Sequence, residues 1–397
     1  MAIKQYKKDI FIKQFGLCTI ISLILESIDD MLSNAMNDAR QVIKDLEQYH
    51  EPLLLQSSNV MNQIQTSFKM WGMHTRSEFN IRKLAHAALI SLITTKKFKN
   101  GDIKSANVLP AVLKYIREYC PLDKIECSTD KYRTIDGTCN NIMHPNWGAN
   151  GTPMQRIIEP FYANGVDELR TSATDGTELP NVRYLSNLFF VMKYLPILKV
   201  NTMVALWAHF VYTDLVHIGS LQLFKDKTSV NNFGLKIIVP DEEQTPLPCC
   251  APEIQQHPEC KSVVISKNDP SYSGFLDCVP YTRTAPAPRP KCELGPREQA
   301  NQVTSFLDAS VIYGSTIQRA RALRTFRNGQ LLTSLDPLNQ NMPPTTDLLC
   351  SMLKINGECD SSNNHHSFIS GSDHVNFLPS TVVLHTIWIR QHNRIAI

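Results

Sequence analysis

Apolar residues recur three and four positions apart along several stretches of this chain, a spacing that predicts amphipathic α-helices. The clearest stretch runs from Ser27 to about His50. Between Thr245 and Pro290 the periodicity is lost and proline and cysteine are dense, which predicts a loop pinned by disulfides. The other predicted helices are Arg82–Leu92, Ala111–Tyr119, Leu185–Tyr194, Thr202–Leu215, Gln299–Tyr313 continuing into Ile317–Phe326, and Ser380–Ile397. The pattern therefore predicts a mainly α-helical fold with long, disulfide-pinned loops.

The N-terminus has the charge pattern of a secretory signal. Four lysines precede an apolar run from Phe15 to Leu25, which is too short to span a bilayer. We expect residues 1–26 to be a signal peptide, with an ordinary buried helix as the alternative, because the residues after Leu25 offer no small-x-small cleavage site. Residues 27–117 carry no catalytic constellation, so they are predicted to be a helical N-terminal extension or pro-region.

Composition narrows the class of protein. A hydrophobic content of 43% with 19% charged residues is typical of a globular chain, and a net charge of +3 gives no case for a nucleic-acid partner. All of the 11 cysteines except Cys18 lie at or after position 120. Pairs such as Cys127 with Cys139 and Cys350 with Cys359 would close short loops. This usage favours an oxidising compartment, and hence a secreted protein.

Several segments, in the same order along the chain, resemble motifs of the animal haem peroxidase family. Their residues are most similar to those of the insect chorion-peroxidase-like and peroxinectin-like members. The resemblance covers residues from about 118 to the end and implies the N-terminal part of that family's helical domain. In the family, the histidine that binds haem iron from the proximal side lies downstream of the last motif here. The matching segments are Tyr132–Asn141, Pro145–Gly148 with Gly151–Pro153, Trp207–Leu215, Pro286–Pro288 leading to Gly295–Gln299, Thr304–Ser315 and His385–Arg394.

The resemblance also locates the haem pocket, and its reactive positions are substituted. Tyr212 stands where the family has an aspartate that bonds haem, and Thr213 where it has the distal histidine. A gapless alignment from Phe368 to Pro379 puts His374 at the catalytic arginine and Phe377 at the haem-bonding glutamate. Threonine cannot act as a base near neutral pH, and neither Tyr212 nor Phe377 can form an ester. Covalent haem attachment and peroxidase chemistry are therefore predicted to be lost.

His209 replaces a family glutamine that faces the distal cavity. Positions 209 and 213 are four apart on a predicted helix and share a face. An imidazole there could coordinate iron or act as a displaced base, while the alternative is a histidine satisfied by ordinary packing. His217, His385 and His392 are interpreted as structural.

A calcium site is predicted where the chain resembles the family's calcium loop. Thr304, Phe306, Asp308 and Ser310 alternate, so an extended loop can turn hydroxyl, carbonyl and carboxylate oxygens toward one point. Asp214 would add a second carboxylate from the helix. Hard oxygen ligands with two negative charges suit Ca²⁺, with helix capping by the same polar residues as the alternative.

These features favour an inactive pseudoperoxidase or truncated product that keeps a calcium-stabilised scaffold and has lost the reaction. The alternative is an active oxidoreductase that uses hydrogen peroxide, with the proximal half absent from this sequence. A nonfunctional fragment is a third hypothesis, which the ending within a predicted helix favours. We expect a small peroxide as partner only if the protein is active, and otherwise an extracellular protein partner. No membrane span is expected.

Overall fold

The computed structural model describes chiefly residues 28–45, 79–98, 132–190, 201–219, 257–345 and 368–397, with isolated gaps and a few shorter pieces between them. The predicted signal peptide, the predicted helix Ala111–Tyr119 and the pair Cys350 and Cys359 lie outside the described residues.

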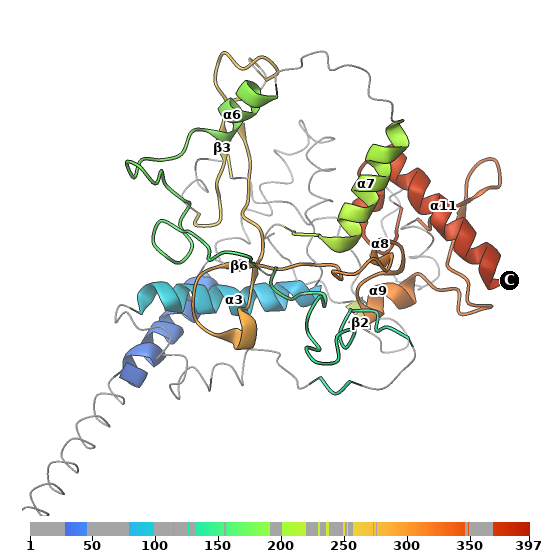
Figure 1. The fold of residues 1–397 in the computed structure, drawn as a ribbon, viewed down its shortest axis with the longest axis horizontal. Coiled ribbons are helices and arrows are strands. Elements are labelled where there is room, and N and C mark those ends of the chain that lie inside the picture. The colour runs from blue at the N-terminus through green and yellow to red at the C-terminus, as the bar shows by residue number, and fades with distance from the viewer. Residues whose placement is uncertain are drawn as a thin grey trace, which may run out of the picture.

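The described elements are mainly helical, as the pattern predicts (Figure 1). Each strand is two residues long and pairs antiparallel with the next strand along the chain. The strands are β1 (Ser229–Val230), β2 (Lys236–Ile237), β3 (Val263–Val264), β4 (Cys278–Val279), β5 (Pro286–Ala287), β6 (Glu298–Gln299), β7 (Ser334–Leu335) and β8 (Asn341–Met342). The helices are residues 28–45, α3 (Phe79–Lys97), α6 (Val182–Phe189), α7 (Thr202–Leu215), η2 (Pro290–Cys292), α8 (Ser310–Tyr313), α9 (Ile317–Ala322), η3 (Asp373–Asn376) and α11 (Pro379–Ala396).

The N-terminal helices pack against each other and against the rest of the chain. Apolar residues of helix 28–45, including Leu32 and Met36, form a buried cluster with Ile90 of α3 and with Leu294. Thr95 Oγ1 accepts a hydrogen bond from Gly295 N at 3.1 Å. The two helices predicted at 27–50 and 82–92 are therefore confirmed over 28–45 and within α3.

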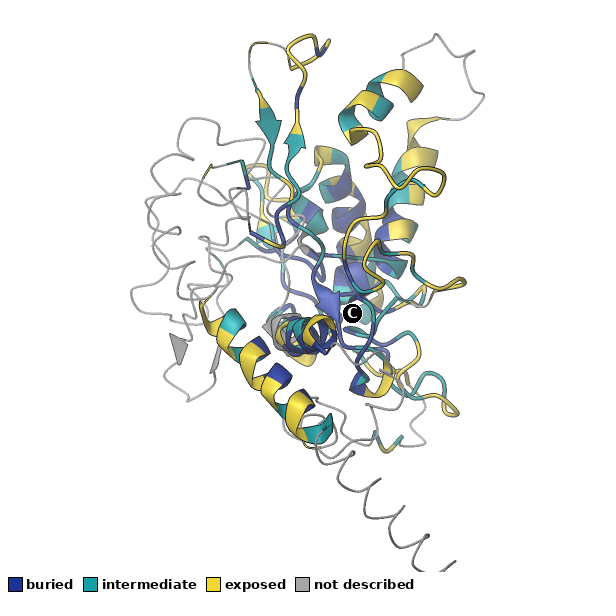
Figure 2. Ribbon diagram, turned by 90° about the vertical axis from the view of Figure 1, so that its left-hand side faces the viewer, coloured by how far each residue is buried: buried dark blue, intermediate teal, exposed yellow. Residues whose placement is uncertain are grey.

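A second buried core joins α7, α8, α9 and α11. Phe210, Val311, Leu323, Leu384 and Ile389 are all buried in it. Asn201 caps α7 by accepting a hydrogen bond from Met203 N at 3.0 Å, and Pro379 occupies the first turn of α11, where its missing N–H costs nothing. Figure 1 shows α7 and α11 side by side with α8 at their base, and Figure 2 shows the buried faces turned inward.

Several predicted helices have different bounds in the structure; the helix predicted at Ile317–Phe326, for example, is α9 and ends at Ala322. α6 begins at Val182 rather than Leu185 and ends at Phe189, because the backbone of Phe190 is no longer helical; residues 191–194 of the prediction lie outside the described residues. The predicted helix Gln299–Tyr313 is wrong over its first part. Residues 298–299 form β6, the chain then runs as an irregular loop, and only Ser310–Tyr313 is helical. Long-range hydrogen bonds fix this loop in its non-helical conformation, among them the bond from Gln302 N to His217 O at 2.7 Å.

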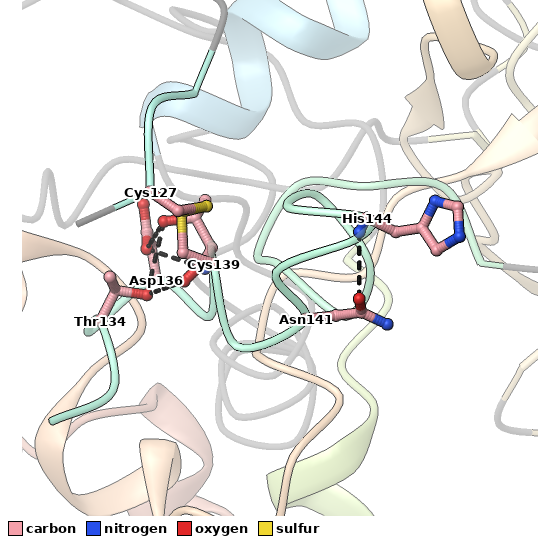
Figure 3. Close-up of a disulfide and its surroundings, with 7 residues drawn as sticks. Cys127, Thr134, Asp136, Cys139, Asn141 and His144 are labelled. Atoms are coloured by element: carbon pink, nitrogen blue, oxygen red, sulfur yellow. Dashed lines mark hydrogen bonds between the residues drawn. A yellow bond between two sulfur atoms is a disulfide. The ribbon is translucent and has the colours of Figure 1, made fainter. Parts of the chain in front are cut away.

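Disulfides fix the loops. The predicted bridge Cys127–Cys139 is confirmed, with Cα atoms 5.4 Å apart, and Figure 3 shows it beside the turn of Asp136. In that turn Asp136 Oδ1 accepts a hydrogen bond from Thr138 Oγ1 at 2.7 Å. The predicted pinning of 245–290 is confirmed by two further bridges, Cys249–Cys260 and Cys250–Cys278.

Candidate functional site

Helix α7 carries four of the predicted site residues, His209, Tyr212, Thr213 and Asp214. His209 and Thr213 lie one turn apart, and Asp214 follows at the end of the helix. Thr213 is buried, and its Oγ1 donates to the carbonyl oxygen of Phe210 at 3.0 Å. This local bond is the usual way in which a threonine inside a helix satisfies its hydroxyl. The Thr213 hydroxyl is therefore already committed to the helix backbone.

The segment before α11 brings the other predicted positions to the same place. His374 lies in η3 and Phe377 follows directly after it. The ring centroid of Phe377 lies 5.5 Å from that of His209 in a stacked arrangement, and the His374 centroid lies 6.3 Å from it, edge-on. His374 also meets His217 edge-on at 4.5 Å. Three of the positions assigned from the sequence therefore form one aromatic cluster beside Thr213.

His209 differs from its neighbours in its hydrogen bonding. Its Nε2 atom is buried and has no hydrogen-bond partner among the residues that the structure describes. Burial lowers the pKa of His209 below its ordinary value of 6.5, which keeps the imidazole neutral at neutral pH. Most buried polar atoms are hydrogen-bonded, so this nitrogen needs an explanation.

Tyr212 does not join the cluster. Its side chain is 60% exposed, on a different face of α7 from the buried Thr213. The structure thus brings together His209, Thr213, His374 and Phe377 but leaves Tyr212 at the surface.

The residues of the predicted calcium site also converge, around the start of α8. Thr304 Oγ1 donates to Asp308 Oδ2 at 2.7 Å, and Ser310 Oγ donates to Asp214 Oδ1 at 3.1 Å. Asp308 Oδ1 accepts from Ser310 N at 2.9 Å, so Ser310 links the two carboxylates. The carbonyl oxygen of Phe306 accepts from Asp308 N at 2.9 Å. The side-chain oxygens of Asp214, Thr304, Asp308 and Ser310 are thus gathered in a buried position, with the Phe306 carbonyl next to them.

Both carboxylates also cap α8, which is the alternative role left open by the sequence. Asp214 Oδ2 accepts from Ala309 N at 2.9 Å, for example. Burial raises the pKa of Asp214 above its ordinary value, and the nearby negative charge of Asp308 raises it further. In the described part of the chain, no three His, Cys, Asp or Glu side chains form a metal-binding group.

Sequence reasoning missed two contacts around these sites. Arg133 Nη1 lies 3.1 Å from Asp308 Oδ2, and its positive charge offsets part of the negative charge of the two carboxylates. In the sequence, the position of Arg133 within the Tyr132–Asn141 motif was the only indication that it has a role. His385 of α11 is buried, and its Nδ1 lies 2.7 Å from Ser370 Oγ, which donates to the carbonyl of Val311 at 3.1 Å. His385 therefore joins α11 to the core beneath α8, in agreement with its interpretation as structural.

Comparison with known proteins identifies the family. The model of the animal haem peroxidase family matches residues 132–397. The chain is 31% identical to chorion peroxidase of Aedes aegypti over 71% of its own length and 34% of that relative. It is 30% identical to chorion peroxidase of Drosophila melanogaster over 67% of its length and 31% of that relative. It is also 31% identical to a mouse peroxidasin homologue over 68% of its length and 18% of that relative.

Among solved structures, peroxidase A of Dictyostelium discoideum aligns with 68% of this chain and 46% of its own, at 18% identity and a TM-score of 0.46. The chain spans about a third of the length of the two chorion peroxidases. Since the family model covers more than half of the sequence, the chain belongs to the animal haem peroxidase family.

Proposed function

We propose that this protein keeps the scaffold of a haem peroxidase but does not reduce peroxide, and that its remaining role is binding. The observation that carries the proposal is the Thr213 hydroxyl. The family resemblance assigns it to the position of the distal base, and in the structure it is buried and donates to the Phe210 carbonyl. A threonine hydroxyl is not a base near neutral pH, so it cannot take the first proton of hydrogen peroxide, a step typically worth roughly 10²–10⁴-fold in rate.

The second substituted position supports the same proposal. His374 stands where the family has its arginine, and an imidazole lacks the fixed charge and the forked donors of a guanidinium. Its Nδ1 is also engaged with Ser372 Oγ at 2.9 Å. A peroxide bound here would find neither a proton acceptor at 213 nor a permanent positive charge at 374.

One observation favours an active enzyme as the second candidate. The free Nε2 of His209 lies on the same face of α7 as Thr213 and has a lone pair or proton to offer. If His209 acted as a displaced base, the chain would be an oxidoreductase that uses hydrogen peroxide. The assay below separates the two candidates.

Haem is the cofactor implied by the family, and the aromatic cluster fits it in a non-covalent form. The buried, unpaired His209 nitrogen offers a polar atom, and the Phe377 ring beside it offers a flat apolar surface. Haem supplies the iron redox chemistry of the family when it is bound. In this chain Tyr212 and Phe377 lack the carboxylates that an ester bond requires, so these residues would hold haem without attaching it.

Oxidation of a chromogenic donor such as guaiacol tests the proposal. We expect the haem-loaded protein, supplied with hydrogen peroxide, to oxidise the donor no faster than free haem at the same concentration. Turnover that saturates with peroxide and exceeds free haem, and that disappears in a His209→Ala variant, would establish the second candidate instead.

We also propose that Asp214, Thr304, Phe306, Asp308 and Ser310 bind Ca²⁺, which ties α7 to the start of α8. The proposal is supported by two carboxylates and two hydroxyls that contact one another in a buried position. Oxygen ligands of this kind are those that Ca²⁺ prefers. The role of the ion would be structural.

Calcium is expected to stabilise the folded protein. A ligand that binds only the native state at 100 times its dissociation constant adds about 2.7 kcal/mol to the free energy of unfolding. Thermal unfolding in excess Ca²⁺ and in EDTA measures this. The Asp308→Asn variant should lose the response, while Asp277→Asn, at an exposed aspartate, should keep it. An unchanged melting curve of the wild type in EDTA would refute the site.

We propose an extracellular location. All seven cysteines in the described part of the chain form disulfides, among them Cys127, Cys249 and Cys292. Bridges of this density persist in oxidising compartments. The helices in the described part of the chain include none with the length and apolar character to cross a membrane.

A further inference from the structure

We propose that the Nε2 atom of His209 bonds directly to the iron of a non-covalently held haem. This inference rests on the proposed function, in which the distal face of α7 has lost its base. It assigns to His209 a ligand role at a position that holds glutamine in the family motif.

The hydrogen-bonding state of the imidazoles selects His209. His385 Nδ1 is paired with Ser370 Oγ, and His374 Nδ1 with Ser372 Oγ. Both nitrogens of His392 are engaged, by the Tyr313 hydroxyl and the Gly329 carbonyl, each at 3.0 Å. His209 Nε2 is buried and has no hydrogen-bond partner in the part of the chain that the structure describes. Imidazole nitrogen is a common protein ligand of haem iron, so an unpaired one beside the cofactor face suits this role.

The surroundings of His209 fit a flat cofactor. The Phe377 ring stacks on the imidazole with an angle of 30° between the two planes, and His374 approaches edge-on. Thr213, one turn along α7, turns its hydroxyl back to the Phe210 carbonyl and offers no nitrogen. The His209 side chain as a whole is half-buried, so exposing its Nε2 atom requires side-chain movement rather than unfolding.

A direct bond from His209 would have a chemical consequence for the protein. It would provide a haem ligand within the part of the domain that this sequence contains, whereas the family's proximal histidine lies downstream of its last motif.

Haem titration tests the assignment by spectroscopy, without a need for activity. Ferric protoporphyrin IX is added to the wild type, to His209→Ala and His209→Gln, and to the exposed-histidine control His144→Ala. We expect the wild type and the control to shift the Soret band and to give the paramagnetic resonance spectrum of nitrogen-ligated ferric haem. Both His209 variants should lose that spectrum and bind haem about 10–100-fold more weakly. Removal of a residue that only supports a metal ligand already lowers affinity by about that factor, so loss of the ligand itself should cost at least as much. Free imidazole should restore the spectrum of His209→Ala.

Circular dichroism of each variant checks that it is folded. The His209→Gln variant carries the glutamine that the family has at this position. An identical spectrum and affinity in wild type and His209→Ala would overturn the assignment, as would a wild type that does not bind haem. Failure of the proposed function is a different result, namely turnover of peroxide by the wild type, so the two are distinguishable.

Discussion

Replacing Glu259 with glutamine is expected to lower the free energy of unfolding by about 3–5 kcal/mol. Glu259 makes two hydrogen bonds to the guanidinium of Arg297, at 2.8 and 2.7 Å, and the Arg297 and Glu259 side chains are only 1% and 6% exposed. Arg297 Nη2 also donates to the carbonyl of Thr284 at 2.6 Å. Loss of the carboxylate leaves a positive charge buried without its counter-charge, and that penalty gives the large effect.

Urea or thermal unfolding measures the effect. The matched control is Glu178→Gln, which changes an exposed glutamate and should alter stability by less than about 0.5 kcal/mol. A second control, the double variant Glu259→Leu/Arg297→Met, removes both charges and should recover much of the loss, since apolar replacements of buried pairs are often well tolerated. A Glu259→Gln protein within about 1 kcal/mol of the wild type would show that the pair is solvated.

Acidification is expected to destabilise the protein through His385. Burial, with a smaller contribution from His209, lowers the pKa of His385 from its ordinary value of 6.5 to about 3. Above pH 6.5 the side chain is neutral in both the folded and unfolded states and has no effect. Below it, the unfolded chain binds a proton that the folded chain cannot accept. Stability therefore falls between pH 6.5 and 3, by up to roughly 5 kcal/mol and by about 2 kcal/mol at pH 5.

The difference between the wild type and His385→Gln isolates this effect, because other buried histidines titrate in the same direction. Glutamine can bond Ser370 but does not titrate, so its unfolding free energy should fall by about 2 kcal/mol less between pH 7 and 5. The His144→Gln variant, at an exposed histidine, should follow the wild type. Parallel pH profiles of the wild type and His385→Gln would contradict the burial of a neutral imidazole.

Local patterns predicted most of the helices. The predicted bounds of Thr202–Leu215 are those of α7, and Ser380–Ile397 differs from α11 by one residue at each end. These segments have a polar cap or proline at the start and a clear apolar face, so the information that defines them lies within the segment. Local information failed at Gln299–Tyr313. There Asn301 bonds the backbone at Leu215 and His217, 86 and 84 residues away, and these contacts override the local helical spacing.

The candidate site could be predicted only in part. The motif residues His209, His374 and Phe377 do meet in space, because helix α7 and the segment before α11 lie next to each other. The unpaired Nε2 of His209 was not predictable, since a free nitrogen depends on what neighbouring side chains leave unbonded. The ion pair of Glu259 with Arg297 joins residues 38 apart without a local pattern.

The reaction of the haem-loaded protein with hydrogen peroxide tests the central claim most directly, measured by stopped flow beside a Thr213→His/His374→Arg variant that restores a base and a guanidinium. The account predicts that the wild type reacts no faster than free haem and that the variant reacts faster, by up to about 10²–10⁴-fold. A wild-type rate that saturates with peroxide and equals or exceeds that of the variant would contradict it.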